Sequence, residues 1–486
     1  MSLDKIDHFV VLMLENRSFD HMLGYSAIQG TDAISGKPTA INGLTPGTTV
    51  KQVSLDGSVM LPITPDADFV MAHDPAHEFL NVRDQLWGPQ GADPAGNVGF
   101  VYAYSKALGI PFDEAKRVLT VFTPDRLPVL NALAREFAVC DMWFSSIPGP
   151  TWPNRFFVHA ATSGGLIASP DPTDVGGLLS DKYDRACIEG FSFRSGHLFQ
   201  ALEAAKRKWR VYHGDRLPQV AVLEGMVPRL IAGDGFRSFN TFCADAAASD
   251  LPDYVFIEPN YGNTQNFTGG NSQHSVGDAR DGEILIKTVF EAVRSSPLWG
   301  STALIILYDE HGGFFDHIVP GAVKATGDDS MFNGDPDTFD FKTLGFRVPA
   351  IVISPLIPKG IIDHTIYDHT SLVATVEDKF IHSHLTERDK AANTLAHLFT
   401  LDAPRADALL TAPVAATPPP VAAREMGAPP DSSGASFTHL AMAVDIALNP
   451  EQKAAIQNRV RNLKTKADAS QYISEIHNKL LLKRGA

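Results

Sequence analysis

The stretch ALIILYDE, residues 303–310, joins a run of apolar residues to two carboxylates at its end. The same pattern occurs in HFVVLML, residues 8–14, which Glu15 and Asn16 follow. Two further apolar runs are DYVFIEPNY at residues 253–261 and VPAIVISP at residues 348–355. Short runs that are rich in branched residues and end in polar ones are typical of buried strands in a mostly parallel sheet.

Helical stretches are expected between these strands, over residues 127–137, 196–208 and 282–294. Strands and helices that alternate along a chain favour an α/β fold, here a doubly wound, mostly parallel sheet with helices on both faces. In such sheets, ligands bind at the carboxyl ends of the strands. Because the acidic residues follow the strands, we expect the functional site at that edge.

One large domain with appendages is expected for this chain of 486 residues. Its 44% of hydrophobic and 20% of charged residues can form a sizeable core without disulfides. The main domain is assigned to residues 1–411, followed by a Pro- and Ala-rich linker at residues 412–432. Residues 433–486 are expected to be a helical C-terminal segment.

Three local features complete the expected organisation. Asn449 should cap a helix that has Pro450 at its first position. Residues 30–65 and 321–342 should be loops over the sheet edge, because Gly, Thr, Pro and Asp are frequent there. The Asp-rich stretch at residues 328–340 is either a solvated loop or a separate calcium site.

Charge, cysteines and hydropathy limit the partners and the location. A formal net charge of -15 argues against binding nucleic acid, whereas a small phosphate ester near a metal ion is still compatible. Cys140, Cys187 and Cys243 lack CxxC spacing, and a bridge between Cys187 and Cys243 is left open. The sequence shows neither a signal peptide nor a run of the ~20 apolar residues that a membrane span needs, so a soluble protein is expected.

Two pairs of polar residues at strand ends are candidate metal ligands. Glu15 and Asn16 follow one strand, and Asp309 and Glu310 follow another, so four oxygen ligands would suit a divalent cation. The competing interpretation is that each pair simply marks the point where its strand reaches water.

The segment SSIPGPTWPNRFF, residues 145–157, places Thr151 at an expected helix start. A helix N-terminus offers backbone N–H groups to an anion, so the hydroxyl of Thr151 is well placed to meet a phosphate. Thr151 could instead be a simple N-cap. Arg155 is expected to support this loop or to pair with a phosphate.

Histidines lie near these segments, at His73, His77, His213, His274, His311 and His317. Imidazole can hold a metal, hydrogen-bond a phosphoryl oxygen or protonate a leaving group. The remaining histidines considered are expected to be structural: His159, His364, His382, His397, His439 and His477.

Four ordered segments resemble the signatures of the bacterial and plant phosphoesterase family, which contains nonspecific phospholipases C and acid phosphatases. They are ENRSFDHMLG at residues 15–24, TWPNR at 151–155, DEHGGFFDHI at 309–318 and GFRVPAIVISP at 345–355. The resemblance extends over most of residues 6–398, so residues 1–411 would be a phosphoesterase catalytic domain. It implies an alkaline-phosphatase-like α/β fold with its active site at the strand ends.

The resemblance also implies roles for individual residues. Metal ligands would be Glu15, Asn16, Asp309, Glu310 and Thr151, with Thr151 also the nucleophile. Asn16, His77, His213 and His274 would bind the phosphate, and His274 would protonate the leaving group. Arg155, Asp316 and His317 would support the metal loop, whereas Asp368, His369 and Glu377 would brace the fold. Ca²⁺, Mg²⁺ or Mn²⁺ is the favoured metal, with Fe or Zn as alternatives.

The resemblance favours a phospholipase C that acts on phospholipids with varied headgroups, contacts a membrane surface transiently and forms a phosphothreonine. The alternative is an acid phosphatase acting on monoesters. A non-catalytic metal-binding relative is a third reading, and a sulfatase is disfavoured because Thr stands where its x-P-x-R motif needs Cys or Ser. Relatives suggest a secreted or periplasmic protein, and the missing signal peptide leaves a cytoplasmic one open.

Overall fold

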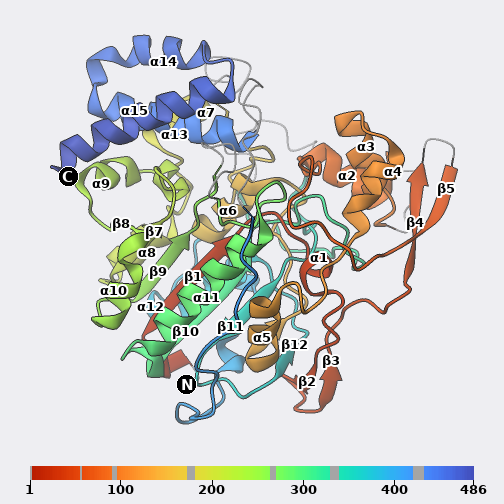
Figure 1. Ribbon diagram of the computed structural model, residues 1–486. Helices are drawn as coiled ribbons and strands as arrows, with labels where there is room; N and C mark the ends of the chain where they lie inside the picture. Colours follow the sequence, from red (N-terminus) through yellow and green to blue (C-terminus); the bar gives the residue numbers. More distant parts are fainter. Residues whose placement is uncertain are drawn as a thin grey trace.

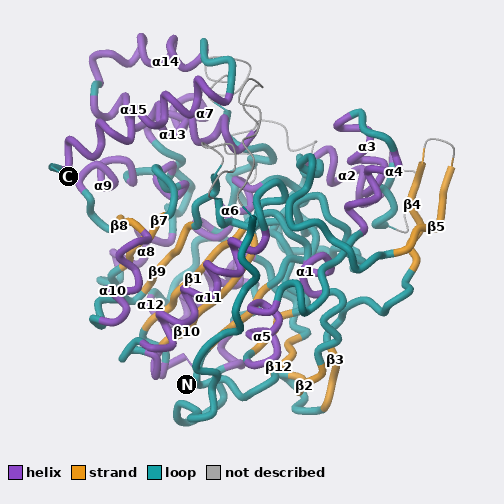
Figure 2. The backbone as a smooth tube through the Cα atoms, in the orientation of Figure 1, coloured by secondary structure: helices purple, strands orange, loops and turns teal. Residues whose placement is uncertain are grey.

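The structure is a computed structural model that describes residues 3–54, 57–89, 96–171, 181–262, 270–328, 339–419 and 432–485. Figure 1 follows the chain from end to end, and Figure 2 separates the strands from the helices and loops around them.

Ten strands of the described chain form one sheet, in the order β3-β2-β12-β6-β11-β10-β1-β9-β7-β8. The neighbours from β10 to β8 all run parallel, and so do β12 with β6 and with β2. The strands are β1 (His8–Leu14), β2 (Gln29–Asp32), β3 (Pro38–Ala40), β6 (Ala138–Cys140), β7 (Trp209–His213), β8 (Phe236–Ser238), β9 (Tyr254–Glu258), β10 (Thr302–Tyr308), β11 (Ala350–Ile353) and β12 (Ile361–Asp363). The prediction of a mostly parallel sheet is confirmed.

β1 and β10, the two strands that the sequence places before acidic or amide residues, are neighbours in the interior of the sheet. Every residue of β10 is buried, as is β1 after its first residue, which matches strands covered on both faces. Their neighbour β11, within the VPAIVISP run, is antiparallel to both β10 and β6. The apolar pattern identifies a buried strand but not its direction.

Helices cover both faces of the sheet (Figure 1). On one face α11 packs on β1, β10 and α5; on the other, α6 packs on α12, whose Phe380 ring contacts Phe9 of β1. The main-domain helices are α1 (Phe19–Leu23), α2 (Phe79–Trp87), α3 (Phe100–Leu108), α4 (Phe112–Ala115), α5 (Pro128–Glu136), α6 (Thr151–Ala160), α7 (Asp181–Glu189), α8 (Leu198–Ala204), α9 (Met226–Ala232), α10 (Phe242–Ala247), α11 (Ala279–Ser295) and α12 (His369–Phe380). The three helices expected from the sequence correspond to α5, α8 and α11.

A buried carboxylate connects two of these helices. Glu283 of α11 accepts hydrogen bonds from the backbone N–H groups of Val129 at 2.6 Å and Leu130 at 2.9 Å. These donors belong to the first turn of α5, where N–H groups have no partner within the helix. The carboxylate therefore caps α5 and fixes it against α11.

The prediction for residues 30–65 is wrong. Instead of loops, β2 and β3 form a hairpin that extends the edge of the main sheet, while β4 (Thr49–Ser54) and β5 (Gly57–Pro62) form a separate two-stranded sheet. Residues 321–328 and 339–342 contain no helix or named strand, and residues 329–338 of the Asp-rich stretch lie outside the described chain.

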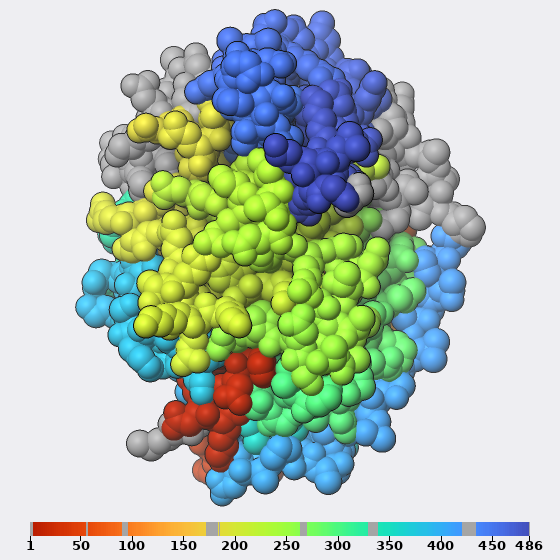
Figure 3. Space-filling model, turned by 90° about the vertical axis from the view of Figure 1, so that its left-hand side faces the viewer, coloured from red at the N-terminus to blue at the C-terminus, as the bar shows by residue number. Residues whose placement is uncertain are grey.

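The C-terminal segment is helical, with α13 (Ser432–Leu448), α14 (Lys453–Arg461) and α15 (Lys466–Arg484). Figure 3 shows these helices covering one end of the molecule, and α13 packs on α7, α9 and α15. Pro450 begins a 3₁₀ turn, Pro450–Gln452, before α14, so Asn449 does not cap an α-helix directly; its amide bonds to Asp445. Of the predicted linker, residues 420–431 lie outside the described residues.

The structure also bears on the cysteines and on possible membrane spans. The cysteines of the described chain form no disulfide, so Cys187 and Cys243 are not bridged. Among the described helices, none is both long enough and apolar enough to cross a bilayer.

Candidate active site

The carboxyl ends of β1 and β10 bring together the two polar pairs that follow them. Leu14 lies opposite Tyr308 in the parallel ladder, so the next residues leave the sheet side by side. The backbone N–H of Asn16 donates to Asp309 Oδ1 at 3.0 Å. The whole group is buried: Glu15, Asn16, Asp309 and Glu310.

The loop after β10 approaches Asn16 closely. Asn16 has a left-handed backbone with φ 58°, a conformation that Asn tolerates better than most residues. Gly312, with φ 63°, lies against it, and a Cβ there would meet the Asn16 carbonyl oxygen at 2.1 Å. This contact explains why glycine follows the acidic pair in DEHGG.

Thr151 is the first residue of α6 and faces Asn16. Its hydroxyl donates to Asn16 Oδ1 at 3.1 Å. Pro150 occupies the N-cap position, so Thr151 is not the N-cap. The turn before it is held by Asn154, whose side chain bonds to backbone groups of Ile147, Gly149 and Pro150. The hydroxyl therefore stands on a well-braced helix start beside the strand-end group.

Both carboxylate oxygens of Asp309 accept hydrogen bonds from protein groups. Its Oδ1 accepts from the N–H groups of Asn16 and Glu310, and its Oδ2 accepts from Arg155 Nε at 2.9 Å. Arg155 also donates to the Tyr261 hydroxyl at 2.6 Å. His369 Nε2 lies 2.6 Å from the Asp309 carbonyl oxygen. The structure thus places Arg155 as a support of the acidic pair, and His369 with it.

Glu15 and Glu310 are the carboxylates that the protein leaves partly unengaged. Neither Glu15 oxygen has a hydrogen-bond partner within the described part of the chain, and the same holds for Glu310 Oε1. Burial, followed by the charge of Asp309, raises the pKa of Glu15 well above its usual range. Burial likewise raises the pKa of Glu310 to about 8. Uncompensated buried carboxylates are costly and therefore indicate a missing partner.

A divalent cation fits this group. The unengaged oxygens of Glu15 and Glu310, and the amide oxygen of Asn16 that accepts from Thr151, are hard oxygen donors carried by the adjoining ends of β1 and β10 and the start of α6. A cation would supply a direct partner to these oxygens, of which Glu310 Oε1 lies 3.8 Å from His77 Nε2 and has no hydrogen-bond partner in the described chain. The group is compatible with a divalent metal, and its donor set suits Ca²⁺, Mg²⁺ or Mn²⁺.

His77 lines the same group. Its Nδ1 lies 2.6 Å from the Pro75 carbonyl oxygen, and its Nε2 lies 3.2 Å from Asn16 Nδ2 and 3.8 Å from Glu310 Oε1. Although burial opposes the charged ring, the negative charges of Glu310 and Asp74 raise the pKa of His77 to about 10. In the metal-free protein, His77 therefore carries the positive charge nearest to Glu310.

His274 lies across from His77, with ring centroids 6.3 Å apart. Its Nε2 is 3.5 Å from Asp74 Oδ2. Asp74, His77 and His274 each present one atom within 4.8 Å of the others. Two of the three predicted phosphate-binding histidines thus belong to one cluster, together with a carboxylate that the sequence did not single out.

His213 ends β7, one strand beyond β9 in the sheet. It lies opposite Glu258, and its Nδ1 is 2.7 Å from the Asp215 carbonyl oxygen, while Nε2 has no hydrogen-bond partner among the described residues. Burial lowers the pKa of His213 to about 4. The structure therefore places a neutral His213 at the same edge of the sheet, without a hydrogen bond to Thr151 or Asn16.

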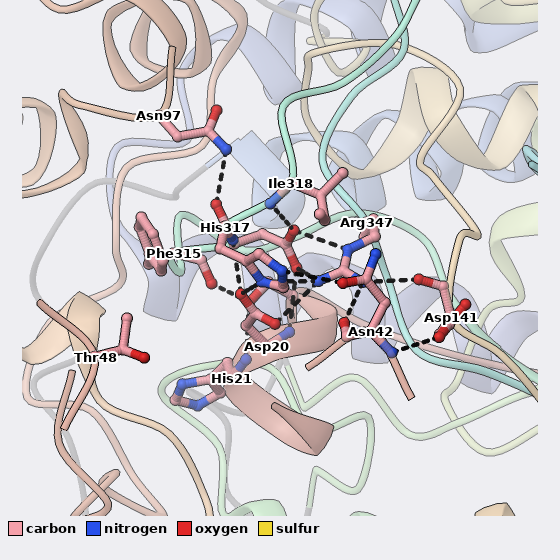
Figure 4. Close-up of polar contacts among 12 residues, drawn as sticks. Asp20, His21, Asn42, Thr48, Asn97, Asp141, Phe315, His317, Ile318 and Arg347 are labelled. Atoms are coloured by element: carbon pink, nitrogen blue, oxygen red, sulfur yellow. Dashed lines mark hydrogen bonds and ion pairs between the residues drawn. The ribbon is translucent and has the colours of Figure 1, made fainter. Parts of the chain in front are cut away.

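Asp316 and His317 belong to a second cluster. Figure 4 shows its members His317, Asp20 and Arg347. The Arg347 guanidinium donates to Asp316 Oδ1 at 2.9 Å and to Asp20 Oδ1 at 3.0 Å. His317 Nδ1 lies 2.7 Å from Asp20 Oδ2. Arg347 also donates to the carbonyl oxygens of Asn42 and Asp141. This cluster ties the two loops that carry the acidic group to the rest of the fold.

Some pairings near the site were not predicted from the sequence. Asp74 and Tyr261 become partners of site residues only when distant loops meet. His311 and Gln85 are a second case: His311 Nε2 lies 2.7 Å from Gln85 Oε1, and its Nδ1 lies 3.2 Å from Glu310 Oε2. The candidate histidines His73 and His77 and the DEHGG segment, residues 309–313, indicated the neighbourhoods but not these pairings.

Comparison with known proteins identifies relatives of the chain. The family model described as Phosphoesterase family matches residues 6–381. Non-specific phospholipase C3 of Arabidopsis thaliana is 33% identical over 430 residues, covering 85% of this chain and 77% of the relative. Non-specific phospholipase C6 of the same plant is 36% identical over 84% of this chain and 76% of the relative. Phospholipase C B of Mycobacterium tuberculosis is 29% identical over 83% and 79%.

A solved structure of a protein in the alkaline phosphatase superfamily from Vibrio parahaemolyticus aligns with a TM-score of 0.31 and 15% identity, covering 52% of this chain and 60% of that one. The assignment rests on the sequence matches. They define the protein as an enzyme, a phosphoric ester hydrolase. The chain belongs to the Phosphoesterase family.

Proposed function

We propose that the protein is a metal-dependent phospholipase C that accepts varied headgroups and releases diacylglycerol and a phosphorylated headgroup. The names of the relatives support the substrate class. The observation that carries the proposal is the hydrogen bond from Thr151 to Asn16 at the strand ends that also carry the unengaged oxygens of Glu15 and Glu310.

Thr151 is the proposed nucleophile. A divalent cation held by Glu15, Asn16, Asp309, Glu310 and Thr151 would lower the pKa of a bound hydroxyl and neutralise charge on the phosphate. Asn16 already accepts the Thr151 proton in a hydrogen bond, which orients the hydroxyl oxygen. Attack on phosphorus gives a phosphothreonine that carries the headgroup, and water then releases it.

The remaining site residues bind and orient the substrate. Asn16 Nδ2, together with His77, would donate to the phosphoryl oxygens, and the start of α6 would add backbone N–H groups. The Nδ1–H of His213 donates to the Asp215 carbonyl oxygen, so the neutral ring has no proton on Nε2. His213 can therefore donate from Nε2 only if the negative charge of a bound phosphate causes the ring to become protonated. His274 would protonate the departing alcohol.

Residues that contact the proposed metal ligands or their loops, but not the substrate, have supporting roles. Arg155 holds Asp309, and Asp316 with His317 holds the loop that follows it. These contacts keep the ligands and the nucleophile in a fixed geometry, which matters because small displacements of reacting groups cost rate.

The alternative activity is that of an acid phosphatase. A phosphomonoester presents a dianion without a second substituent, whereas a phospholipid presents a diester with a diacylglycerol. One assay therefore distinguishes the two activities. It compares the hydrolysis of phosphatidylcholine, a diester, with that of p-nitrophenyl phosphate, a monoester, under the same conditions.

The experiment compares wild type with Thr151→Val and Thr151→Ser. We expect wild type to release diacylglycerol, chelation to abolish the release and metal to restore it. Thr151→Val keeps the shape of the side chain but removes the hydroxyl, so activity should fall by at least about a thousandfold. Thr151→Ser keeps a hydroxyl and should retain measurable turnover. Peptide mass spectrometry of a quenched wild-type reaction should locate the phosphorylated headgroup on Thr151.

Unchanged thermal unfolding of Thr151→Val is the control for folding. Full activity of Thr151→Val would overturn the nucleophile, and activity confined to p-nitrophenyl phosphate would replace the phospholipase by a phosphatase.

A further inference from the structure

Asp74 is the acidic residue of the site region that has no role so far. One of its carboxylate oxygens lies 3.5 Å from His274 Nε2, and its side chain is 35% exposed. The other oxygen accepts a hydrogen bond from the Ser275 hydroxyl. Its third neighbour is His77, within 4.8 Å. Asp74 thus stands between the two imidazoles that flank the acidic group.

The loop that carries Asp74 is held against the loop that carries His274. The Met71 N–H donates to the Ser275 carbonyl oxygen at 2.8 Å, and the Ala279 N–H donates to the Phe69 carbonyl oxygen at 3.0 Å. On the other side, the Tyr104 hydroxyl donates to the His73 carbonyl oxygen at 2.9 Å. These bonds fix the position of the Asp74 carboxylate relative to the His274 ring.

We propose that Asp74 is a positioning residue, which orients the His274 imidazole and keeps it protonated for transfer to the departing alcohol. The inference rests on the phospholipase C function proposed above. A carboxylate beside an imidazole favours its charged form and restricts its rotation. The Ser275 hydroxyl in turn holds the carboxylate, so the order of contacts is Ser275, Asp74 and His274.

The proton balance of the two steps is as follows. In the first step, Thr151 reacts in its deprotonated form, its hydroxyl proton having been released to solvent before the attack. Its oxygen bonds to phosphorus, the bond between phosphorus and the diacylglycerol oxygen breaks, and the His274 ring gives its proton to that oxygen. In the second step, water attacks phosphorus, its proton goes to the neutral His274 ring, and the bond from phosphorus to Thr151 breaks. Asp74 remains a carboxylate throughout and stabilises the imidazolium of the resting enzyme.

A second metal ion held by Asp74, His77 and His274 is the competing use of the same cluster. His77 Nδ1 lies 2.6 Å from the Pro75 carbonyl oxygen, and the Asn16 side-chain amide lies 3.2 Å from His77 Nε2. A metal on Nε2 would have to displace the Asn16 side chain, whose amide oxygen accepts from Thr151. The contacts therefore favour the carboxylate–imidazole pair, and metal content distinguishes the two uses.

The test exploits leaving groups that differ in their need for a proton. Phosphatidylcholine and p-nitrophenyl phosphorylcholine share a headgroup, but an alkoxide needs a proton to leave and a nitrophenolate does not. With enzyme in excess, only the first step is observed. Asp74→Asn should slow diacylglycerol release by about a hundredfold and nitrophenolate release by less than about threefold. Ser275→Ala should also slow diacylglycerol release more than nitrophenolate release, but by a smaller factor than Asp74→Asn.

A double variant separates positioning from general damage. If Asp74 acts through His274, adding Asp74→Asn to His274→Gln should cause no further loss with phosphatidylcholine. Metal content per chain should be the same in wild type and Asp74→Asn.

Equal losses on both esters, additive losses in the double variant, or one metal ion fewer per chain would overturn the proposal. Failure of the proposed function is distinct, because wild type would then release no diacylglycerol at all.

Discussion

Two groups of buried carboxylates lie along the same pair of loops, and they differ in what compensates their charge. Asp20 and Asp316 share one guanidinium, because Arg347 donates to both. Glu15 and Glu310 have oxygens without any hydrogen-bond partner in the described chain, and the arginine beside them, Arg155, pairs with Asp309 instead.

The difference separates a structural cluster from a binding site. A carboxylate buried with a guanidinium contributes to a fixed arrangement, whereas carboxylate oxygens buried without a hydrogen-bond donor destabilise the fold until a ligand binds. The protein therefore supplies its own guanidinium where two segments must be held, and leaves carboxylate oxygens without a donor where a metal ion would bind. Four variants and conditions test this comparison.

The largest effect is expected from Glu15→Gln. The amide is close in shape but is a poor metal ligand, so phosphodiester hydrolysis should fall by at least about a thousandfold. Stability should not fall in parallel, because an amide costs less to bury than an unpaired carboxylate. Turnover at saturating metal and the unfolding temperature in chelator are the two measurements. Loss of stability without loss of turnover would reverse the roles assigned to the two groups.

Arg347→Met should act mainly on stability. Removal of the guanidinium leaves Asp20 and Asp316 buried without their shared cation, which costs about 3–5 kcal/mol. Denaturant titration measures the loss, and metal binding by the folded fraction should persist. Adding Asp20→Asn and Asp316→Asn should recover part of the stability. If Arg347→Met left the free energy of unfolding unchanged, the cluster would not need its guanidinium.

The metal-free protein should lose stability as the pH rises. Glu310 has an ordinary pKa of 4.5 and a folded-state pKa of about 8, so the folded state binds more protons than the unfolded state between these values. Stability therefore falls across this window. His77, raised from 6.5 to about 10, acts in the same direction at higher pH.

Added divalent cation should reverse this loss, because it binds the deprotonated carboxylates. The gain in unfolding temperature on adding metal should grow from about pH 5 to about pH 8. Thermal unfolding with chelator and with Mg²⁺, Ca²⁺ or Mn²⁺ at several pH values measures it. A gain that is independent of pH would argue against Glu310 as a ligand.

The smallest effect is expected from Tyr261→Phe. This change removes the hydroxyl that accepts from Arg155 Nη1, so the support of Asp309 is weakened and kcat should fall by about tenfold. Tyr254→Phe is the matched control, since the Tyr254 hydroxyl is buried without a hydrogen-bond partner in the described residues. Equal effects of the two changes would show that Arg155 does not depend on Tyr261.

The strand-end residues were predictable because they depend on local pattern. An apolar run followed by Glu15 and Asn16, or by Asp309 and Glu310, indicates a buried strand and its polar end wherever the strand lies in the sheet. The parallel ladder between β1 and β10 then places the two pairs together. The direction of β11 was not predictable, because it depends on partners distant in sequence. The hairpins within residues 30–65 pair locally, β2 with β3 and β4 with β5, and the prediction missed them because it relied on composition.

The sequence by itself determined the α/β class, the buried strands, the polar residues at their ends and, through its motifs, the family. Tertiary structure alone decided which of the buried charges are compensated: Arg347 reaches Asp20 and Asp316, Arg155 reaches Asp309, and Asp74 reaches His274. The physical reason is the distance along the chain over which each effect acts. Periodicity and capping act over a few residues, whereas charge compensation depends on distances across the folded chain, which no local pattern records.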